Sequence, residues 1–131
     1  MNEVTYDNMS EQLIEAVPEL RSRYQEELDW WREEKPPTHV MYGNLLNPFL
    51  IALLETNNQD EVLRRVFGFL EKLARHEDIL VREVVAVTVL ERLWGEKDLW
   101  AKAQEIMGKE TLRIAQAVEI NRRDGTPLQS I

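Results

Sequence analysis

Residues 59–74 restrict the fold more than any other segment, because their apolar side chains recur with the period of an α-helix. At about 100° per residue these side chains share one face, and mostly charged side chains take the opposite face. The apolar positions are Val62, Leu63, Val66, Phe67, Phe69, Leu70, Leu73 and Ala74. Asn58 is placed to cap this helix, with Glu61 as the acid of a capping box. Such a helix must bury its apolar face, so the pattern predicts a folded helical domain.

Residues 78–94 predict a second helix of a different kind. The run Val84–Leu90 is apolar on every side, and charged residues lie only towards the ends of the segment. Its β-branched residues would also suit a strand. However, the segment is long enough for about four helical turns, and Gly95 follows it in a position that commonly ends a helix. We therefore expect a helix that is surrounded by other helices.

Turn-forming residues divide the rest of the chain into further short helices. Pro18 is expected to start one of them, the pair Pro36-Pro37 to end it, and Gly108 to separate the last two. A chain of 131 residues suits one domain. We predict an all-α domain over residues 1–131 with about five to seven helices, in which residues 1–8 and 126–131 are loose tails.

Composition narrows the classes of partner. The formal net charge is −8, which argues against nucleic acid as a ligand because phosphate binding needs a basic surface. The same charge permits a basic protein partner, although acidity also keeps proteins soluble without any partner. No segment approaches the roughly 20 apolar residues of a membrane span, no signal-peptide pattern is seen, and cysteine is missing. We therefore expect a cytoplasmic protein without disulfides and without membrane contact.

Motifs that would indicate catalysis or cofactor binding are missing from the sequence. It contains no G-x-S-x-G, no P-loop and no dinucleotide-binding glycine pattern. His39 and His76 are its two histidines. His76, Glu77 and Asp78 are contiguous at a helix break, so they cannot present three metal ligands on one helix face. A solvated turn is expected there, and we expect no metal, no cofactor and no enzymatic activity.

The helix that follows Pro18 combines an acidic face with two adjacent tryptophans. Trp30 and Trp31 cannot face the same way on a helix, so one is expected in the core and the other near the surface. An exposed tryptophan beside carboxylates can anchor a protein partner. The alternative is a tryptophan that the Pro36-Pro37 loop half covers. The candidate partner-binding residues are Glu26, Glu27, Asp29, Trp30, Glu33 and Glu34.

A second candidate site comes from polar residues in apolar surroundings. Asn47 and Pro48 are expected to start a buried helix after an irregular segment, and asparagines there need hydrogen-bond partners. Glu83 falls on an apolar face of helix 78–94, where we favour a structural tie over a functional acid. Its expected form is an ion pair with Arg64 or Arg65, and a loop N–H is the other candidate partner. The residues of this small-ligand or enzymatic pocket are Tyr42, Asn44, Asn47 and Glu83. A purely structural subunit or homo-oligomer is the third interpretation.

One segment resembles part of a known repeat. Asp78-x-x-Val81-Arg82, followed by Ala86, Val89, Leu90 and Leu93, is similar to the second helix of a HEAT repeat. The resemblance covers about half of one repeat, and the rest of the chain shows no clear internal period. It implies antiparallel helix pairs that stack in a short right-handed superhelix, and a compact helical bundle is the alternative.

A second resemblance covers most of the chain, from about residue 17 to 119. Its sequence blocks are VPELRSRY, YGNLLNPFLIALLE, LRRVFGFLEKLA, VREVVAVTVLERL and AQEIMGKETLRIAQAVE. Together they resemble a family of small helical bacterial proteins of unknown function. Some such families are regarded as immunity proteins, which neutralise toxins passed between bacteria. The resemblance implies no catalytic residues. We expect a non-enzymatic protein-binding module of the immunity-protein kind, in which carboxylates steer a basic partner, a few aromatic anchors hold it, and occlusion is the mechanism.

Overall fold

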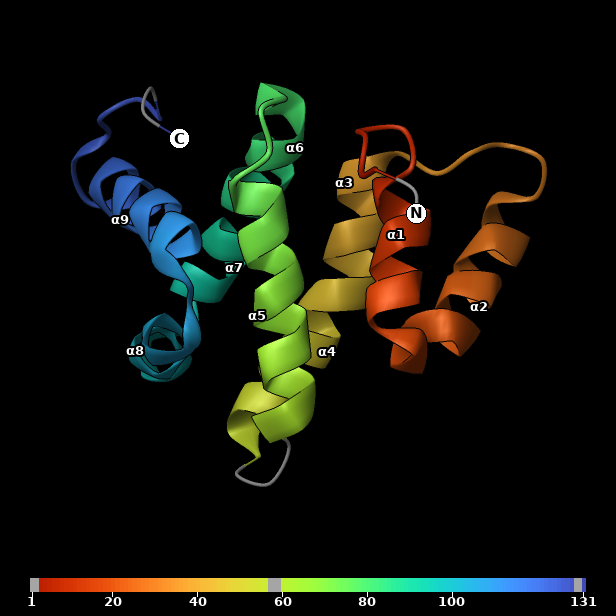
Figure 1. Cartoon of the computed structure of the whole chain (residues 1–131), viewed down its shortest axis with the longest axis horizontal. Helices are drawn as coiled ribbons and strands as arrows, with labels where there is room; N and C mark the ends of the chain where they lie inside the picture. The colour runs from red at the N-terminus through yellow and green to blue at the C-terminus, as the bar shows by residue number, and fades with distance from the viewer. Residues whose placement is uncertain (1–2, 57–59, 129–130) are drawn as a thin grey trace.

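The chain folds into helices that follow one another across the molecule nearly in sequence order (Figure 1). The structure is a computed structural model and describes residues 3–56, 60–128 and 131. The elements are α1 (Met9–Ala16), η1 (Pro18–Leu20), α2 (Arg21–Trp31), α3 (Thr38–Met41), η2 (Tyr42–Leu46), α4 (Asn47–Glu55), α5 (Asp60–Ala74), α6 (Ile79–Glu83), η3 (Val84–Leu90), α7 (Glu91–Trp94), α8 (Lys97–Ile106) and α9 (Lys109–Asp124). Within the described ranges they join into seven continuous helices without a strand, which confirms the predicted all-α fold. None of these helices has the length and apolar character that a membrane span needs.

Helix α5 lies in the middle of the molecule and matches the predicted amphipathic helix (Figure 1). Its buried residues are Leu63, Val66, Phe67, Phe69, Leu70, Leu73 and Ala74, all from the predicted apolar face. Helices α1, α4, α8 and α9 pack against it. The proposed cap by Asn58 lies outside the described residues. The hydrophobic period therefore identified both this helix and the face that it buries.

The second predicted helix runs without a break from α6 through η3 to α7, and its middle is a π-helix. Asp78 caps the first turn, since its carboxylate accepts a hydrogen bond from the Leu80 N–H at 2.9 Å. The buried residues of η3 are Val84, Val85, Ala86, Val89 and Leu90. Val87 is 42% exposed. The prediction of a helix surrounded by other helices therefore holds except on the side that Val87 faces.

The helix that contains Pro48 begins earlier than predicted. We expected an irregular segment followed by a helix start at Asn47, but α3, η2 and α4 form one helix from Thr38 to Glu55. A proline inside a helix removes one hydrogen bond, and its ring clashes with the carbonyl four residues earlier. The wider π-helical turn of η2 comes directly before this position and gives the ring room. The proline is thus accommodated within a helix and does not start one.

The two π-helical segments, η2 and η3, pack against each other and are joined by side chains that reach backbone carbonyls. The Asn47 amide donates to the carbonyls of Thr88 and Val89, at 3.1 and 3.4 Å. In the opposite direction, the Arg92 guanidinium donates to the Gly43 carbonyl at 2.8 Å. Where hydrogen bonding changes between the π and α patterns, a carbonyl lacks its usual donor within the helix. The Gly43 carbonyl is such a case, because the Asn47 N–H bonds to the Tyr42 carbonyl and Pro48 has no N–H, so Arg92 supplies the donor from a neighbouring helix.

Val4 and Ile131, which belong to the predicted loose tails, contact the core. Val4 is buried, and its carbonyl lies 2.6 Å from Nε2 of His76. Ile131 is also buried, and its carbonyl accepts a hydrogen bond from Arg82 Nε at 3.1 Å. Residues 1–2 and 129–130 of the predicted tails lie outside the described residues. The prediction is wrong for Val4 and Ile131, because partners far along the chain hold them in place.

Gly68→Ala is expected to raise the free energy of unfolding by about 0.5–1 kcal/mol. Gly68 lies inside α5 on its exposed side, where a methyl group would meet no neighbouring atom within 4 Å. Alanine therefore gains helix propensity and loses less backbone entropy on folding, without a steric cost. Urea denaturation of the two proteins measures the difference. A lower midpoint for the variant would contradict this expectation.

Candidate functional site

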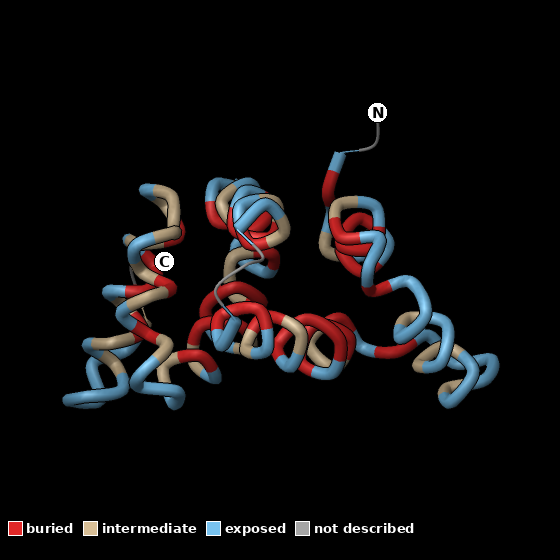
Figure 2. The backbone as a smooth tube through the Cα atoms, turned by 90° about the horizontal axis from the view of Figure 1, so that it is seen from below, coloured by how far each residue is buried: buried red, intermediate tan, exposed pale blue. Residues whose placement is uncertain are grey.

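Helix α2 forms one end of the molecule and is weakly covered by the other helices (Figure 2). None of its residues is buried. It packs on the core through the half-buried side chains of Tyr24 and Leu28. Burial, together with the nearby Glu11 carboxylate, raises the pKa of the Tyr24 hydroxyl above its ordinary value. Most of the surface of α2 is therefore open to a partner.

Five of the six predicted partner-binding residues form an exposed group on α2 and the turn that follows it. These residues are Glu26, Asp29, Trp30, Glu33 and Glu34, and we name them the acidic–aromatic surface. Trp30 is 81% exposed. Glu26 and Trp30 are four residues apart on α2, so their side chains lie on the same face of the helix. The structure thus places an uncovered indole ring next to carboxylates.

The sixth predicted residue, Glu27, has a structural role. Its Oε2 accepts hydrogen bonds from the Trp31 indole N–H at 3.0 Å and from the Asn44 amide at 3.2 Å. This carboxylate therefore links α2 to η2, and Glu27 is not part of the acidic–aromatic surface. Trp31 is half-buried and Trp30 is exposed, so the two tryptophans face different ways, but the prediction that one of them enters the core is wrong. The alternative of a Trp30 half covered by a loop is wrong, because the loop leaves its ring exposed.

The backbone turns sharply where the acidic–aromatic surface leaves the helix. Arg32 ends α2 with a φ of 59°. Residues other than glycine rarely adopt a positive φ, and such strained positions are found often at functional sites. Glu33 and Glu34 follow this turn directly and are exposed.

The residues of the predicted small-ligand pocket have separate roles. Tyr42 is fully buried and its hydroxyl donates to the Met9 carbonyl at 2.8 Å. Burial raises the pKa of this hydroxyl well above its ordinary value, so it stays protonated and cannot act as a base near neutral pH. Asn44 is exposed beside Glu27, whereas Asn47 is buried between the π-helical segments. The hollows that lie beside α4, α8 and α9 among the described residues are lined by other side chains.

Glu83 does not form the ion pair that we expected with Arg64 or Arg65. Arg65 instead contacts Glu19 at 2.7 Å and Glu61 at 2.9 Å, and its guanidinium holds the pKa of Glu19 below the ordinary value. Within the described residues, Glu83 is half-buried and has neither a hydrogen bond nor an ion pair. The expected structural tie is therefore wrong, because Arg65 is bound elsewhere and water still reaches Glu83.

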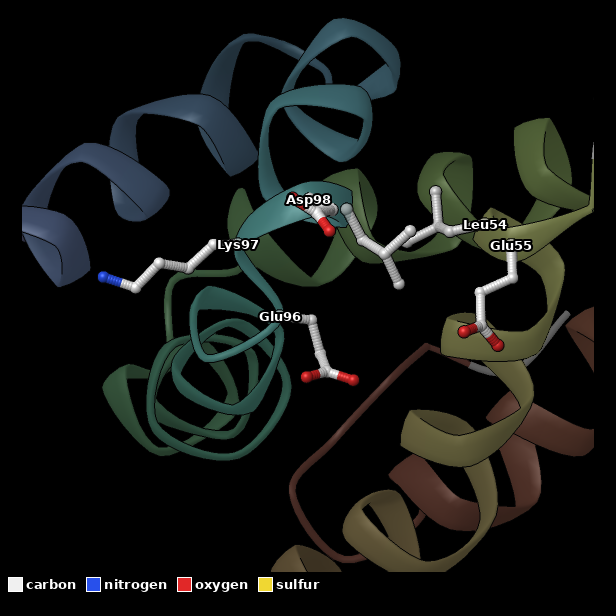
Figure 3. Close-up of a pocket in the computed structure, with 6 residues that line it drawn as sticks. Leu54, Glu55, Glu96, Lys97 and Asp98 are labelled. Atoms are coloured by element: carbon white, nitrogen blue, oxygen red, sulfur yellow. The ribbon is translucent and has the colours of Figure 1, made fainter.

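A hollow of about 450 Å³ lies between the end of α4 and the start of α8 (Figure 3). Its lining residues are Leu54, Glu55, Glu96, Lys97, Asp98 and Leu99. Three of them are carboxylates, and Figure 3 shows Lys97 pointing away from the others. The described residues contain no group of three His, Cys, Asp or Glu side chains that could hold a metal ion. No pattern in the sequence indicated this hollow, because its two walls are about forty residues apart.

Both histidines make hydrogen bonds that support the fold. His39 Nδ1 lies 2.5 Å from the Thr88 hydroxyl. His76 accepts a hydrogen bond from the Asp78 N–H at 3.0 Å through Nδ1, and its Nε2 contacts Val4. His76 is half-buried, so the predicted solvated turn is wrong for this side chain. The reason is that the N-terminal segment packs over it.

A family model described as Domain of unknown function (DUF7674) matches residues 10–122. The match extends from α1 into α9 and includes all of α2. No curated protein and no solved structure matches the chain significantly. These findings agree with the expected relation to a family of unknown function, and they assign no reaction, ligand or partner.

Proposed function

The chain belongs to the family Domain of unknown function (DUF7674), and we propose that this member is a non-enzymatic module that binds a protein partner through its acidic–aromatic surface. The partner presents a basic segment, in which Lys or Arg side chains flank a hollow or an apolar group that receives Trp30. Binding acts by occlusion, since the module covers the basic segment and performs no chemistry on it.

The observation that supports this proposal most strongly is the exposure of Trp30. Trp30 is 81% exposed, so in the isolated chain it lacks most of the favourable free energy that burial of its side chain would give. A partner that covers the ring recovers this free energy, and tryptophan is enriched among the residues that dominate binding. The exposed end helix therefore offers an anchor that the fold itself does not use.

The carboxylates around Trp30 contribute mainly to the rate and selectivity of encounter. Glu26, Asp29, Glu33 and Glu34 are all exposed. An exposed ion pair is worth only about 0–1 kcal/mol and is weakened by salt. A cluster of like charges still raises the association rate with an oppositely charged partner and disfavours acidic ones. We assign affinity to the indole ring and selectivity to the carboxylates.

We extend the proposal to the role that the sequence resemblance implies. In that role the chain is a bacterial immunity protein of the cytoplasm, and its partner is a basic toxin. The support is the similarity of the sequence blocks to helical families of that kind and the absence of cysteine from the chain. A HEAT-like stacking of helix pairs belongs to the same proposal and rests on residues 78–93.

Trp30→Ala is expected to weaken partner binding about tenfold or more, while the free energy of unfolding changes by less than about 0.5 kcal/mol. The tagged chain first captures its partner from cells of its own source, at low salt. The purified partner is then titrated with wild-type and variant protein by calorimetry. Unchanged affinity of the Trp30 variant would rule out the acidic–aromatic surface as the binding site.

The contribution of the carboxylates to binding is tested separately from that of the Trp30 ring. A variant with Gln at positions 26, 33 and 34 should associate more slowly, and its affinity should depend less on salt than that of the wild type. The matched control is a triple variant, Glu96→Gln, Asp98→Asn and Glu105→Gln, because these three carboxylates are exposed on α8 or directly before it, at the other end of the molecule. Equal effects of the control and of the variant at positions 26, 33 and 34 would show that net charge, not the surface on α2, drives the binding.

A further inference from the structure

Helix α2 bears most of the acidic–aromatic surface, yet it contacts the rest of the molecule along one narrow side (Figure 1). None of its residues is buried, and its apolar side chains that pack against the core are those of Tyr24 and Leu28. Apolar contacts are not directional, so they allow a helix at the edge of a molecule to tilt. The direction in which Trp30 points therefore depends on polar contacts between α2 and its neighbours.

Glu27 makes such a contact with Asn44. Oε2 of Glu27 accepts a hydrogen bond from the Asn44 side-chain amide at 3.2 Å and another from the Trp31 indole N–H at 3.0 Å. The first bond joins α2 to η2, and the second joins two successive turns at the end of α2. Hydrogen bonds to a carboxylate are stronger than those between neutral groups. One carboxylate thus connects η2 with the last turn of α2, to which Trp30 belongs.

The backbone at Asn44 is held by the core. Its neighbours Gly43 and Leu45 are buried, and the Gly43 carbonyl accepts a hydrogen bond from Arg92 at 2.8 Å. Asn44 itself is exposed, so its side chain takes no part in the packing of the core. A change of this side chain should therefore affect α2 and leave the rest of the fold intact.

The segment that follows α2 is also held. Lys35 Nζ donates a hydrogen bond to the Asp7 carbonyl at 2.6 Å, and Pro36 is buried. Glu33 and Glu34 lie between this contact and the last turn of α2. The acidic–aromatic surface is therefore connected to other parts of the chain on both sides, and the bond from Asn44 is the one that acts on the helix itself.

We propose that Asn44 is a positioning residue of the acidic–aromatic surface, since through Glu27 it holds α2 at the angle at which a partner receives Trp30. This inference rests on the proposed function, because it concerns the same surface. A surface that is ordered before contact loses less conformational entropy on binding, so the same contacts give a higher affinity. Asn44 has this effect without touching the partner.

Amide hydrogen exchange of the free chain, labelled with nitrogen-15, tests the positioning without a partner. Asn44→Asp replaces the donor by a second carboxylate beside Glu27, and exchange over residues 28–34 should become about threefold to tenfold faster. Adding Glu27→Gln should restore most of the protection. The like charges are then gone, and the Gln side chain supplies a donor for position 44 and an acceptor for the Trp31 N–H. Net charge is also that of the wild type.

The control for the added charge is Gln116→Glu, at an exposed position on α9. It should leave the exchange over residues 28–34 unchanged. Equal exchange in Asn44→Asp and the wild type, equal acceleration by the control, or failure of Glu27→Gln to restore protection would overturn the positioning role.

The same variants are then titrated by calorimetry into the purified partner that serves for Trp30→Ala. Asn44→Asp should weaken binding about threefold to tenfold, although its extra negative charge by itself favours a basic partner. The double variant should recover most of the affinity, and Gln116→Glu should not weaken binding.

These results separate failure of this inference from failure of the proposed function. If Trp30→Ala weakens binding and Asn44→Asp does not, the partner uses the surface without needing α2 to be held, and the inference is overturned alone. If Trp30→Ala leaves the affinity unchanged, the proposed function fails, and exchange in the free chain still shows whether Asn44 holds α2.

Discussion

Leu90→Ala is expected to lower the free energy of unfolding by about 2–4 kcal/mol. Leu90 lies in η3 and is fully buried between helices from both halves of the chain. Truncation removes apolar contacts and leaves a cavity, which close-packed neighbours fill only in part. Such a loss is a large share of the free energy of unfolding of a typical domain, which is roughly 5–15 kcal/mol. Urea denaturation followed by circular dichroism measures it.

The matched control for this variant is Val87→Ala in the same π-helical segment. Val87 is 42% exposed, so its truncation leaves no closed cavity and should change stability by less than about 0.5 kcal/mol. The two positions are three residues apart in the same segment and differ chiefly in burial, since truncation removes three carbons at Leu90 and two at Val87. Equal losses for both variants would mean that η3 buries a different face from the one described.

Glu71→Ala is expected to cost about 1–3 kcal/mol, although Glu71 lies on the polar side of α5. Its carboxylate accepts hydrogen bonds from the backbone N–H groups of Glu110 and Thr111, at 2.9 and 2.8 Å, and from the Thr111 hydroxyl at 2.8 Å. The first N–H groups of a helix have no partner within that helix. Glu71 therefore caps α9 from a neighbouring helix, and its negative charge also suits the positive end of the helix dipole.

The contribution of Glu71 should depend on pH. Burial by itself raises the pKa of this carboxyl, but the N–H groups of Thr111 and Glu110, the Thr111 hydroxyl and nearby Arg75 outweigh it and hold the pKa below the ordinary value of 4.5. A carboxylate with a lowered pKa in the folded state stabilises the fold fully above that ordinary value. The stabilisation is lost as pH falls below it, through the pKa of the folded state. The stability difference between wild type and Glu71→Gln should therefore be constant near neutral pH and shrink in acid.

Two further variants test whether capping is the reason for this effect. Gly108→Ala should destabilise the protein, because the added methyl carbon would lie 2.5 Å from the carboxyl carbon of Glu71 and would displace it. Combined with Glu71→Ala, it should add less than its own single effect, since the cap is already lost. Glu77→Gln, at an exposed position, should leave stability unchanged. Full additivity of the two variants would contradict a shared cap.

The helical class and the main buried faces follow from the local pattern of residues. The period of α5 and the apolar run of η3 are local properties, because a helix brings neighbours three and four residues apart to one face. Charge and two adjacent tryptophans likewise indicated α2 as a polar helix with one exposed ring. The start of the helix through Pro48 was misjudged, since a proline gives the same local signal at a helix start and after a π-helical turn.

Which polar residues are free for a partner depends on how the helices pack against each other. Glu71 caps a helix about forty residues away, Glu27 ties α2 to η2, and Arg65 pairs with Glu19 and leaves Glu83 alone. These contacts join residues that are distant in sequence, and the many carboxylates and cations of the chain allow many alternative pairings. The way in which the apolar faces pack decides which carboxylate pairs with which cation. Helical periodicity describes each helix alone, so it contains no information about these pairings.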